Sequence, residues 1–200
     1  MGATLIEALA GPGYGIDAAF VDAALLSALR AAVARREAAG GFRAAAVGAG
    51  GNRAVRPDIR GDRTCWLIDT ECEAESALLE RFEALRVALN RTLMLGLSDL
   101  ECHYAIYAPG RRYARHLDRS PQGAERVVSV VLYLNEDWRD GDGGELVIAT
   151  DGGEVRVTPQ GGTLAAFLSQ RFEHEVRAAR RERISLTGWF RRRPPSGLPL

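Results

Sequence analysis

Hydrophobic side chains recur at helical spacing in two stretches of the first hundred residues. Apolar positions return every three or four residues between Ile16 and Ala39 and again between Glu73 and Leu95. Asp17 is a suitable cap for the first helix, and Gly40 and Gly96 end the two patterns. Such stripes are typical of helix faces buried in a core. They consist of Val21, Leu25, Leu29 and Val33, and of Leu78, Phe82, Leu85 and Leu89.

The segment between the two predicted helices contains two strand-like stretches around a loop rich in glycine and arginine. We expect strands at 42–47 and 65–68, with the loop at 48–58. A loop of this kind is either a plain connection or a mobile lid over an active site. The sequence leaves both interpretations open.

After Leu100 the pattern changes to short apolar segments separated by turn residues, which indicates a β-sandwich or barrel. The run at 126–134 is apolar almost throughout and predicts a central strand buried on both faces. The predicted strands are 101–107, 112–116, 126–134, 145–149, 154–157, 163–167, 174–177 and 183–190.

This pattern predicts a mainly β protein with flanking helices, in which a double-stranded β-helix (jelly roll) is preceded by α-helices. We interpret residues 1–200 as one domain. Residues 1–100 form an N-terminal support of helices and strands, and residues 101–191 form the catalytic core. The basic, proline-containing stretch 191–200 is expected to fray. Trp66 and Trp138 are interpreted as core residues, with the alternative that they form walls of an active site together with Trp189.

Composition and charge exclude several classes of function. All 26 basic residues are arginine, which rules out Schiff-base lysines and Walker-type phosphate lysines. The formal net charge is zero, so nothing indicates a nucleic-acid or membrane surface. Three cysteines, an odd number without metal spacing, indicate reduced thiols and a cytoplasmic protein. The N-terminus has no basic signal-like region, and no apolar run is long enough to span a bilayer.

The candidate chemistry begins with a histidine and an aspartate two positions apart. Side chains at His116 and Asp118 lie on one face of an extended strand. One imidazole and one carboxylate are two-thirds of the facial triad that holds Fe(II) with open positions. The chain has two further histidines, His103 and His174, and His174 lies in a predicted strand. His116, Asp118 and His174 therefore form a candidate iron site.

Arg183 follows His174 by nine residues and shares a strand face with Ser185 and Thr187. A 2-oxo acid with a second carboxylate, such as 2-oxoglutarate, needs a buried arginine to neutralise its far end. Tyr133 on the central strand can donate a hydrogen bond to the same carboxylate. Each feature alone also fits a surface histidine or a solvated arginine cluster. Their occurrence together on predicted strands favours the iron site.

From about residue 59 to residue 190, the chain resembles the Fe(II)/2-oxoglutarate-dependent prolyl hydroxylases. The resemblance is greatest to the oxygen-sensing branch that modifies hypoxia-inducible factor and to its bacterial relatives. An arginine at 183, where the collagen-type branch usually has lysine, favours that branch. The turn before Tyr113 is one residue shorter than in the animal enzymes. The matching segments are Ile59–Asp62, Tyr107 with Tyr113–Asp118, Arg126 with Tyr133–Trp138, Gly143–Leu146, His174–Val176, and Arg183 with Thr187–Trp189.

The resemblance implies a role for each matching residue. His116, Asp118 and His174 would bind iron, and Arg183 and Tyr133 would hold the 2-oxoglutarate 5-carboxylate. The remaining roles would fall to Tyr107 and Tyr113 in the cosubstrate pocket, Thr187 behind it, and Asp62, Arg126 and Trp189 at the prolyl substrate.

The implied function is hydroxylation of a prolyl residue in an intracellular protein, coupled to decarboxylation of 2-oxoglutarate to succinate and carbon dioxide. The cofactors are Fe(II), 2-oxoglutarate and O2, with ascorbate as a supporting reductant. The partner is a proline-containing protein or peptide, and the enzyme is expected to be a bacterial, cytoplasmic monomer or weak dimer. One alternative is hydroxylation of a free amino acid or small metabolite. Another is a non-catalytic ligand-binding protein on the same barrel.

Overall fold

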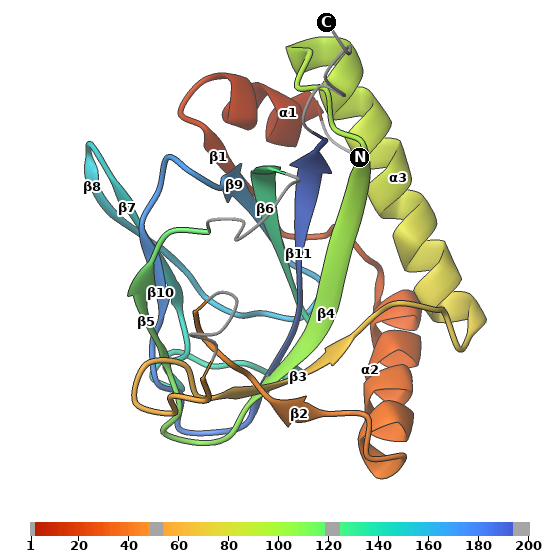
Figure 1. Ribbon diagram of the computed structural model, residues 1–200, viewed down its shortest axis with the longest axis vertical. Helices are drawn as coiled ribbons and strands as arrows, with labels where there is room; N and C mark the ends of the chain where they lie inside the picture. The colour runs from red at the N-terminus through yellow and green to blue at the C-terminus, as the bar shows by residue number, and fades with distance from the viewer. Residues whose placement is uncertain (1–2, 49–53, 119–124, 194–200) are drawn as a thin grey trace, which may run out of the picture.

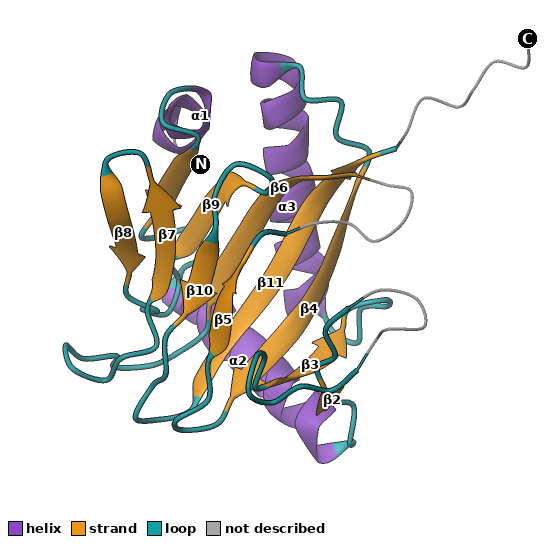
Figure 2. Ribbon diagram, turned by 60° about the vertical axis from the view of Figure 1, so that its left-hand side comes forward, coloured by secondary structure: helices purple, strands orange, loops and turns teal. Residues whose placement is uncertain are grey.

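Two antiparallel sheets face each other, and helices cover the outer side of the larger one (Figures 1 and 2). The computed structural model describes residues 3–48, 54–118 and 125–193. The large sheet has the order β1-β9-β6-β11-β4-β3-β2, and the small sheet has the order β5-β10-β7-β8. This arrangement confirms the predicted jelly roll with flanking helices. The strands are β1 (Tyr14–Asp17), β2 (Arg43–Ala44), β3 (Asp62–Trp66), β4 (Asp99–Tyr107), β5 (Tyr113–His116), β6 (Glu125–Tyr133), β7 (Leu146–Thr150), β8 (Gly153–Val157), β9 (Leu164–Leu168), β10 (His174–Val176) and β11 (Arg183–Arg192).

The helices are α1 (Ala3–Ala10), α2 (Ala23–Ala38) and α3 (Glu73–Leu93). Helix α2 begins after Asp22, whose carboxylate accepts a hydrogen bond from the Leu25 amide at 2.8 Å. The prediction that this helix starts near Asp17 is wrong, because Tyr14–Asp17 pair with β9 instead. That pairing joins segments about 150 residues apart, so no local pattern reveals it. Helix α1 was not predicted.

Several predicted strand boundaries shift because neighbouring strands decide them. The strand expected at 42–47 shrinks to β2, while β3 begins at Asp62 because 62–66 pair with β4. β11 runs through Arg192, so the fraying expected from residue 191 is wrong for its first two residues. Residues 49–53, on which the lid interpretation largely rests, and residues 194–200 lie outside the described residues. The division of the chain at residue 100 stays a prediction.

Alternation along the central strands separates two layers of core. On β4, Cys102, Tyr104 and Ile106 face the helices, whereas Ala105 and Tyr107 face the small sheet. Strands β6, β9 and β11 follow the same rule, so odd-numbered residues point between the sheets. Leu29 of α2 and Leu78, Phe82, Leu85 and Leu89 of α3 fill the helical layer. Each such side chain contributes about 1.5–3 kcal/mol on burial. The layer between the sheets, by contrast, holds the polar residues of the predicted site.

Trp138 is buried and its indole N–H donates to the Gly143 carbonyl at 3.0 Å, which fits the predicted core role. Trp66 is 41% exposed, so its assignment to the core is wrong. It ends β3, beside which only the two-residue β2 extends the sheet. Among the described helices, none is both long and apolar enough to cross a membrane.

Candidate metal centre

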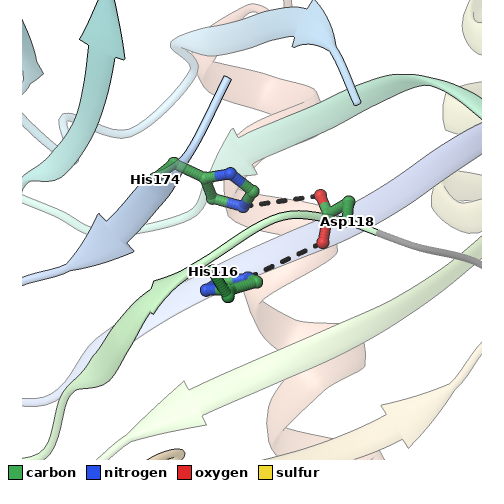
Figure 3. Close-up of side chains that lie close together, drawn as sticks. All are labelled: His116, Asp118 and His174. Carbon is green, nitrogen blue, oxygen red and sulfur yellow. Dashed lines mark ion pairs between the residues drawn. The ribbon is translucent and has the colours of Figure 1, made fainter. Parts of the chain in front are cut away.

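Two histidines and an aspartate converge beside adjacent strands of the small sheet (Figure 3). His116 ends β5 and His174 begins β10, and strand pairing places the two residues opposite each other. Asp118 follows two residues after β5, so the prediction that it shares a strand with His116 is wrong in detail. Its side chain nevertheless turns towards both imidazoles. One ligand atom from each residue lies within 4.8 Å of the other two.

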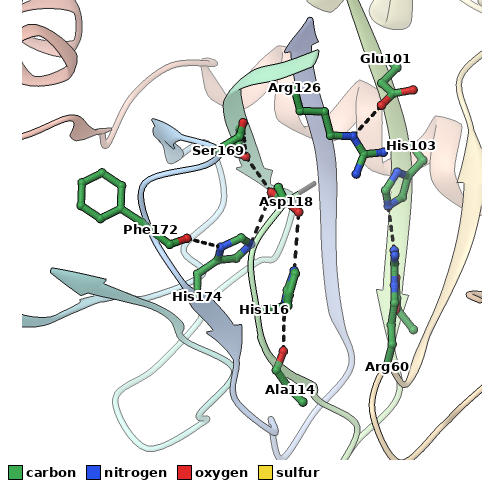
Figure 4. Close-up of polar contacts among 12 residues, drawn as sticks. Arg60, Glu101, His103, Ala114, His116, Asp118, Arg126, Ser169, Phe172 and His174 are labelled. Carbon is green, nitrogen blue, oxygen red and sulfur yellow. Dashed lines mark hydrogen bonds and ion pairs between the residues drawn. The ribbon is translucent and has the colours of Figure 1, made fainter. Parts of the chain in front are cut away.

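Hydrogen bonds behind the two rings determine which nitrogen faces the carboxylate (Figure 4). Nδ1–H of His116 donates to the Ala114 carbonyl at 2.8 Å, and Nδ1–H of His174 donates to the Phe172 carbonyl at 3.1 Å. In a neutral ring, Nε2 then offers a lone pair. These Nε2 atoms lie 3.6 and 3.4 Å from the Asp118 oxygens. Lone pairs that face a carboxylate this closely fit a cation held between them.

The carboxylate of Asp118 stays ionised although it is buried. Burial raises its pKa, but the adjoining imidazoles of His116 and His174 and the hydroxyl of Ser129 together hold that pKa below its ordinary value. Ser129 donates to Oδ2 at 2.7 Å and fixes the carboxylate's orientation. Burial lowers the pKa of His174, which favours the neutral, metal-binding ring. Two imidazoles and one carboxylate are the donor set that suits Fe(II).

Arg183 lies at the inner end of the same layer and is only 1% exposed. Its Nε–H donates to the Gly144 carbonyl at 2.8 Å, and Nη1–H donates to Ser185 at 3.2 Å. Within the described ranges, Nη2 has no hydrogen-bond partner and no carboxylate lies within ion-pair distance of the guanidinium. The buried hydroxyl of Tyr133 is likewise unpartnered there. A buried cation beside an unused donor requires an anion, and a carboxylate of 2-oxoglutarate fits that need.

Gly144 makes this arrangement possible. It has a φ of +73°, and a Cβ there would come within 3.2 Å of Arg183 Cδ and 3.1 Å of the Trp138 ring. Any larger residue would therefore push away the arginine that its own carbonyl holds. Gly144 of the sequence motif is thus explained by the position of Arg183, whereas a Cβ at Gly143 would come within 2.5 Å of the Ala178 carbonyl oxygen.

One pocket connects the metal centre with Arg183 and encloses about 540 Å³, its open mouth included. Ten of the eleven predicted site residues line it. The exception is Tyr133, whose ring centre lies 5.2 Å from the Arg183 guanidinium carbon. Tyr113 stacks on His116 at 3.6 Å between ring centres and so supports the ligand. Lining residues are Arg60, Asp62, His103, Ala105, Tyr107, Tyr113, His116, Asp118, Arg126, Val131, Leu146, His174, Val176, Arg183, Thr187 and Trp189.

The three residues predicted to contact substrate lie on the side of the pocket formed by the large sheet. Trp189 lies under Arg126, whose guanidinium carbon is 3.6 Å from the indole centre. Arg126 also donates to Glu101 at 2.8 Å. Asp62 is 3% exposed and accepts two hydrogen bonds from Arg60 at 2.8 and 2.9 Å. The charges of Asp62 and Arg126 are thus already paired within the protein.

Sequence reasoning missed three polar residues of the site. His103 was noted only as a further histidine, yet strand alternation with Ala105 and Tyr107 indicates that it faces inward. The same rule along β6 would have identified Ser129, two residues from Val131. Arg60 could have been found only from its position two residues before Asp62, which would place the two side chains on one face of a strand.

Comparison with known proteins agrees with this geometry. Residues 102–191 match the model of the 2OG-Fe(II) oxygenase superfamily. Human Egl nine homolog 1 is 29% identical over 152 residues, 66% of this chain but only 33% of its own length, so this chain spans about a third of that relative. A prolyl hydroxylase of Trichoplax adhaerens, solved with a hypoxia-inducible-factor peptide fragment, is 26% identical with a TM-score of 0.82, covering 94% of this chain and 87% of its own.

The crystal structure of a Pseudomonas putida prolyl-4-hydroxylase superposes with a TM-score of 0.88 and shares 45% sequence identity. The match covers 97% of this chain and 100% of the other. Both chains therefore share one fold over most of their length. This chain belongs to the 2OG-Fe(II) oxygenase superfamily and, within it, to the prolyl hydroxylases.

Proposed function

We propose that the protein hydroxylates a prolyl residue of an intracellular protein, with Fe(II), 2-oxoglutarate and O2. The observation that carries the proposal is the buried guanidinium of Arg183, which has no anionic partner in the described ranges and shares a pocket with the His116, Asp118 and His174 triad. A cation site and an anion site in one enclosed pocket fit a metal and a chelating dicarboxylate.

His116 and His174 would hold the metal through Nε2, and Asp118 through its carboxylate. Arg183 and Tyr133 would receive the far carboxylate of the cosubstrate, with Tyr107, Tyr113 and Thr187 along the walls. When bound, iron and 2-oxoglutarate supply the oxidising chemistry, with release of succinate and carbon dioxide. The chain's own residues orient these groups, and apolar walls that include Val131 and Leu146 exclude water.

A polypeptide substrate is favoured by the surroundings of the pocket. Trp66 is 41% exposed and lies 4.7 Å from His103, ring centre to ring centre, so an exposed aromatic anchor adjoins the pocket. The Trichoplax relative was solved with a peptide fragment. The alternative of a free amino acid or small metabolite would use the same metal centre. Competition between a proline-containing peptide and free proline for turnover distinguishes the two substrate classes.

The decisive experiment needs no substrate. Fe(II) and then 2-oxoglutarate are added to the protein without oxygen, and the visible spectrum is recorded. We expect a metal-to-ligand charge-transfer band that requires both additions and is absent from His174→Ala. A folded wild-type protein without this band would overturn the proposal and favour a non-catalytic binding protein.

The proposal also covers the compartment, the partners and the assembly of the protein. The free thiols of Cys65, Cys72 and Cys102 fit a reducing, cytoplasmic compartment in a bacterium. Zero net charge fits the proposed absence of nucleic-acid partners. We propose a monomer or weak dimer, with ascorbate as a supporting reductant. Light scattering and turnover with and without ascorbate test these points.

A further inference from the structure

His103 is an unexplained histidine in the pocket wall. It is 1% exposed and lies beside two indoles, with its ring centre 4.7 Å from that of Trp66 and 5.4 Å from that of Trp189. It contributes nothing to the metal triad or to the Arg183 site. Its imidazole is therefore available for another ligand.

The neighbours of His103 fix the position of its proton (Figure 4). Nη2 of Arg60 lies 3.3 Å from Nε2 of the ring. Arginine has only donors, so Nε2 must accept. Asp62 pairs with Arg60 through two hydrogen bonds and keeps the guanidinium in place. Burial, followed by the charge of Arg60, lowers the pKa of His103 to about 3. The ring is neutral, and the proton lies on Nδ1.

That Nδ1–H is buried and has no acceptor in the part of the chain that the structure describes. Nε1–H of Trp189 lacks one there as well. An unused buried donor is unfavourable unless a ligand satisfies it. Both residues line the same pocket, on the wall that the metal and Arg183 do not use. The missing acceptors therefore fit the substrate better than the cosubstrate.

Charges on this wall indicate which acceptor fits. The two cations nearest the unused donors are already neutralised, Arg60 by Asp62 at 2.8 Å and Arg126 by Glu101 at 2.8 Å. What remains free is a pair of neutral N–H groups. A neutral amide carbonyl suits such groups, whereas a free carboxylate would find no unpaired cation on this wall.

We propose that His103, with Trp189, binds a backbone carbonyl oxygen of the prolyl substrate and so selects peptide-bonded proline over free proline. The inference rests on the proposed function and adds a substrate-binding residue to it. The N–H groups of His103 and Trp189 would bind the carbonyl oxygen of an amide bond, which a free amino acid lacks.

The test compares two substitutions. In His103→Asn the side-chain amide nitrogen takes the place of Nδ1, whereas His103→Phe keeps an aromatic ring but removes the N–H. The probe is N-acetyl-L-proline N-methylamide, with free L-proline as its counterpart. Each protein is loaded with Fe(II) and 2-oxoglutarate without oxygen, and the charge-transfer band is recorded before the probe is titrated by calorimetry. We expect His103→Phe to weaken probe binding about five- to tenfold and His103→Asn to retain it within about twofold.

A second measurement observes the proton directly. With ¹⁵N-labelled histidine, NMR at neutral pH should show His103 protonated at Nδ1 only, and the Nδ1 signal should move when the probe is added. The inference is overturned if the proton of His103 is on Nε2, or if the Nδ1 signal does not move when the probe is added. It is also overturned if both variants bind the probe equally weakly. Wild-type binding of L-proline as tight as that of the probe also overturns it. Absence of the band from wild-type protein would instead refute the proposed function itself.

Discussion

The two layers of this molecule each contain a buried arginine, and the two arginines are treated in opposite ways. Arg36 lies between the helices and the large sheet, where Glu75 accepts two hydrogen bonds from it at 2.7 and 2.9 Å. The Asp69 carbonyl and Glu71 complete its partners, and Tyr104 donates to Glu75 at 3.2 Å. Every charge in this network has its counterpart in the fold.

Arg183, between the sheets, is more deeply buried than Arg36, yet among the described residues its hydrogen-bond partners are only neutral oxygens, those of Gly144 and Ser185. The contrast teaches how to distinguish scaffold from site. A network in which every charge is paired needs no ligand to satisfy it. A buried charge that has no partner in the protein instead favours the binding of a ligand of opposite charge.

Arg36→Leu gives the largest expected change in folding. Removal of the guanidinium leaves the carboxylate of Glu75, which is fully buried, without its main partner, and we expect unfolding to become easier by about 3–5 kcal/mol. Urea denaturation measures the change. The double variant Arg36→Leu/Glu75→Leu should recover most of it, because the unpaired charge is gone. A single variant as stable as wild type would show that this network is not structural.

Arg183→Leu should produce the reverse pattern. Without the guanidinium, 2-oxoglutarate affinity should fall about a hundredfold, roughly 2.7 kcal/mol, whereas stability without ligand should change by less than about 1.5 kcal/mol. Anaerobic titration of the charge-transfer band measures the affinity, and Fe(II) binding should persist. Arg35→Ala, on the exposed surface of α2, is the control. Unchanged cosubstrate affinity in Arg183→Leu would show that the carboxylate binds elsewhere.

Ser129→Ala tests whether a hydrogen bond made within the protein also supports the site between the sheets. Loss of the 2.7 Å hydrogen bond frees the Asp118 carboxylate to rotate, and we expect about tenfold weaker Fe(II) binding with little change in the fold. Competition with a metal-sensitive dye provides the measurement. Wild-type affinity would mean that the two histidines alone orient the site.

The smallest effect concerns acid stability in the helical layer. Burial raises the pKa of Glu75, but Arg36 and the Glu71 amide outweigh burial, and the pKa lies below its ordinary value of 4.5. The folded-state pKa is thus the lower one, so ionised Glu75 stabilises the protein above about pH 4.5 and progressively less below it. Glu75→Gln should be less stable than wild type at pH 7, with a gap that narrows on acidification. A constant gap between pH 7 and pH 3 would contradict this assignment.

The local pattern of apolar residues correctly predicted the elements whose own side chains determine them. The stripe of α3 and the apolar run of β6 formed as expected, because their own side chains determine them. The sequence did not reveal β1, since only its pairing with β9 makes Tyr14–Asp17 a strand. It also placed Trp66 in the core, because a tryptophan carries no sign of lying at a sheet edge.

The candidate site followed a similar division. Residue type and spacing were enough to predict His116, Asp118, His174 and Arg183, because histidine and aspartate are common metal ligands and arginine is a common carboxylate-binding residue. His103 and Arg60 were not, since their significance lies in each other: one ring nitrogen accepts only because a guanidinium from another segment stands beside it. A protonation state that depends on a residue from a distant segment can be recognised only in the folded structure.

The alternation of the central strands has a consequence for how this enzyme can evolve. Odd-numbered positions such as His103, Ala105 and Thr187 face the pocket, and even-numbered ones such as Tyr104 and Leu186 face the helices. A mutation that alters the pocket therefore leaves the helical packing on the same strand intact. Substitutions at alternate residues of one strand can thus change the lining of the pocket while the side chains that pack against the helices stay the same.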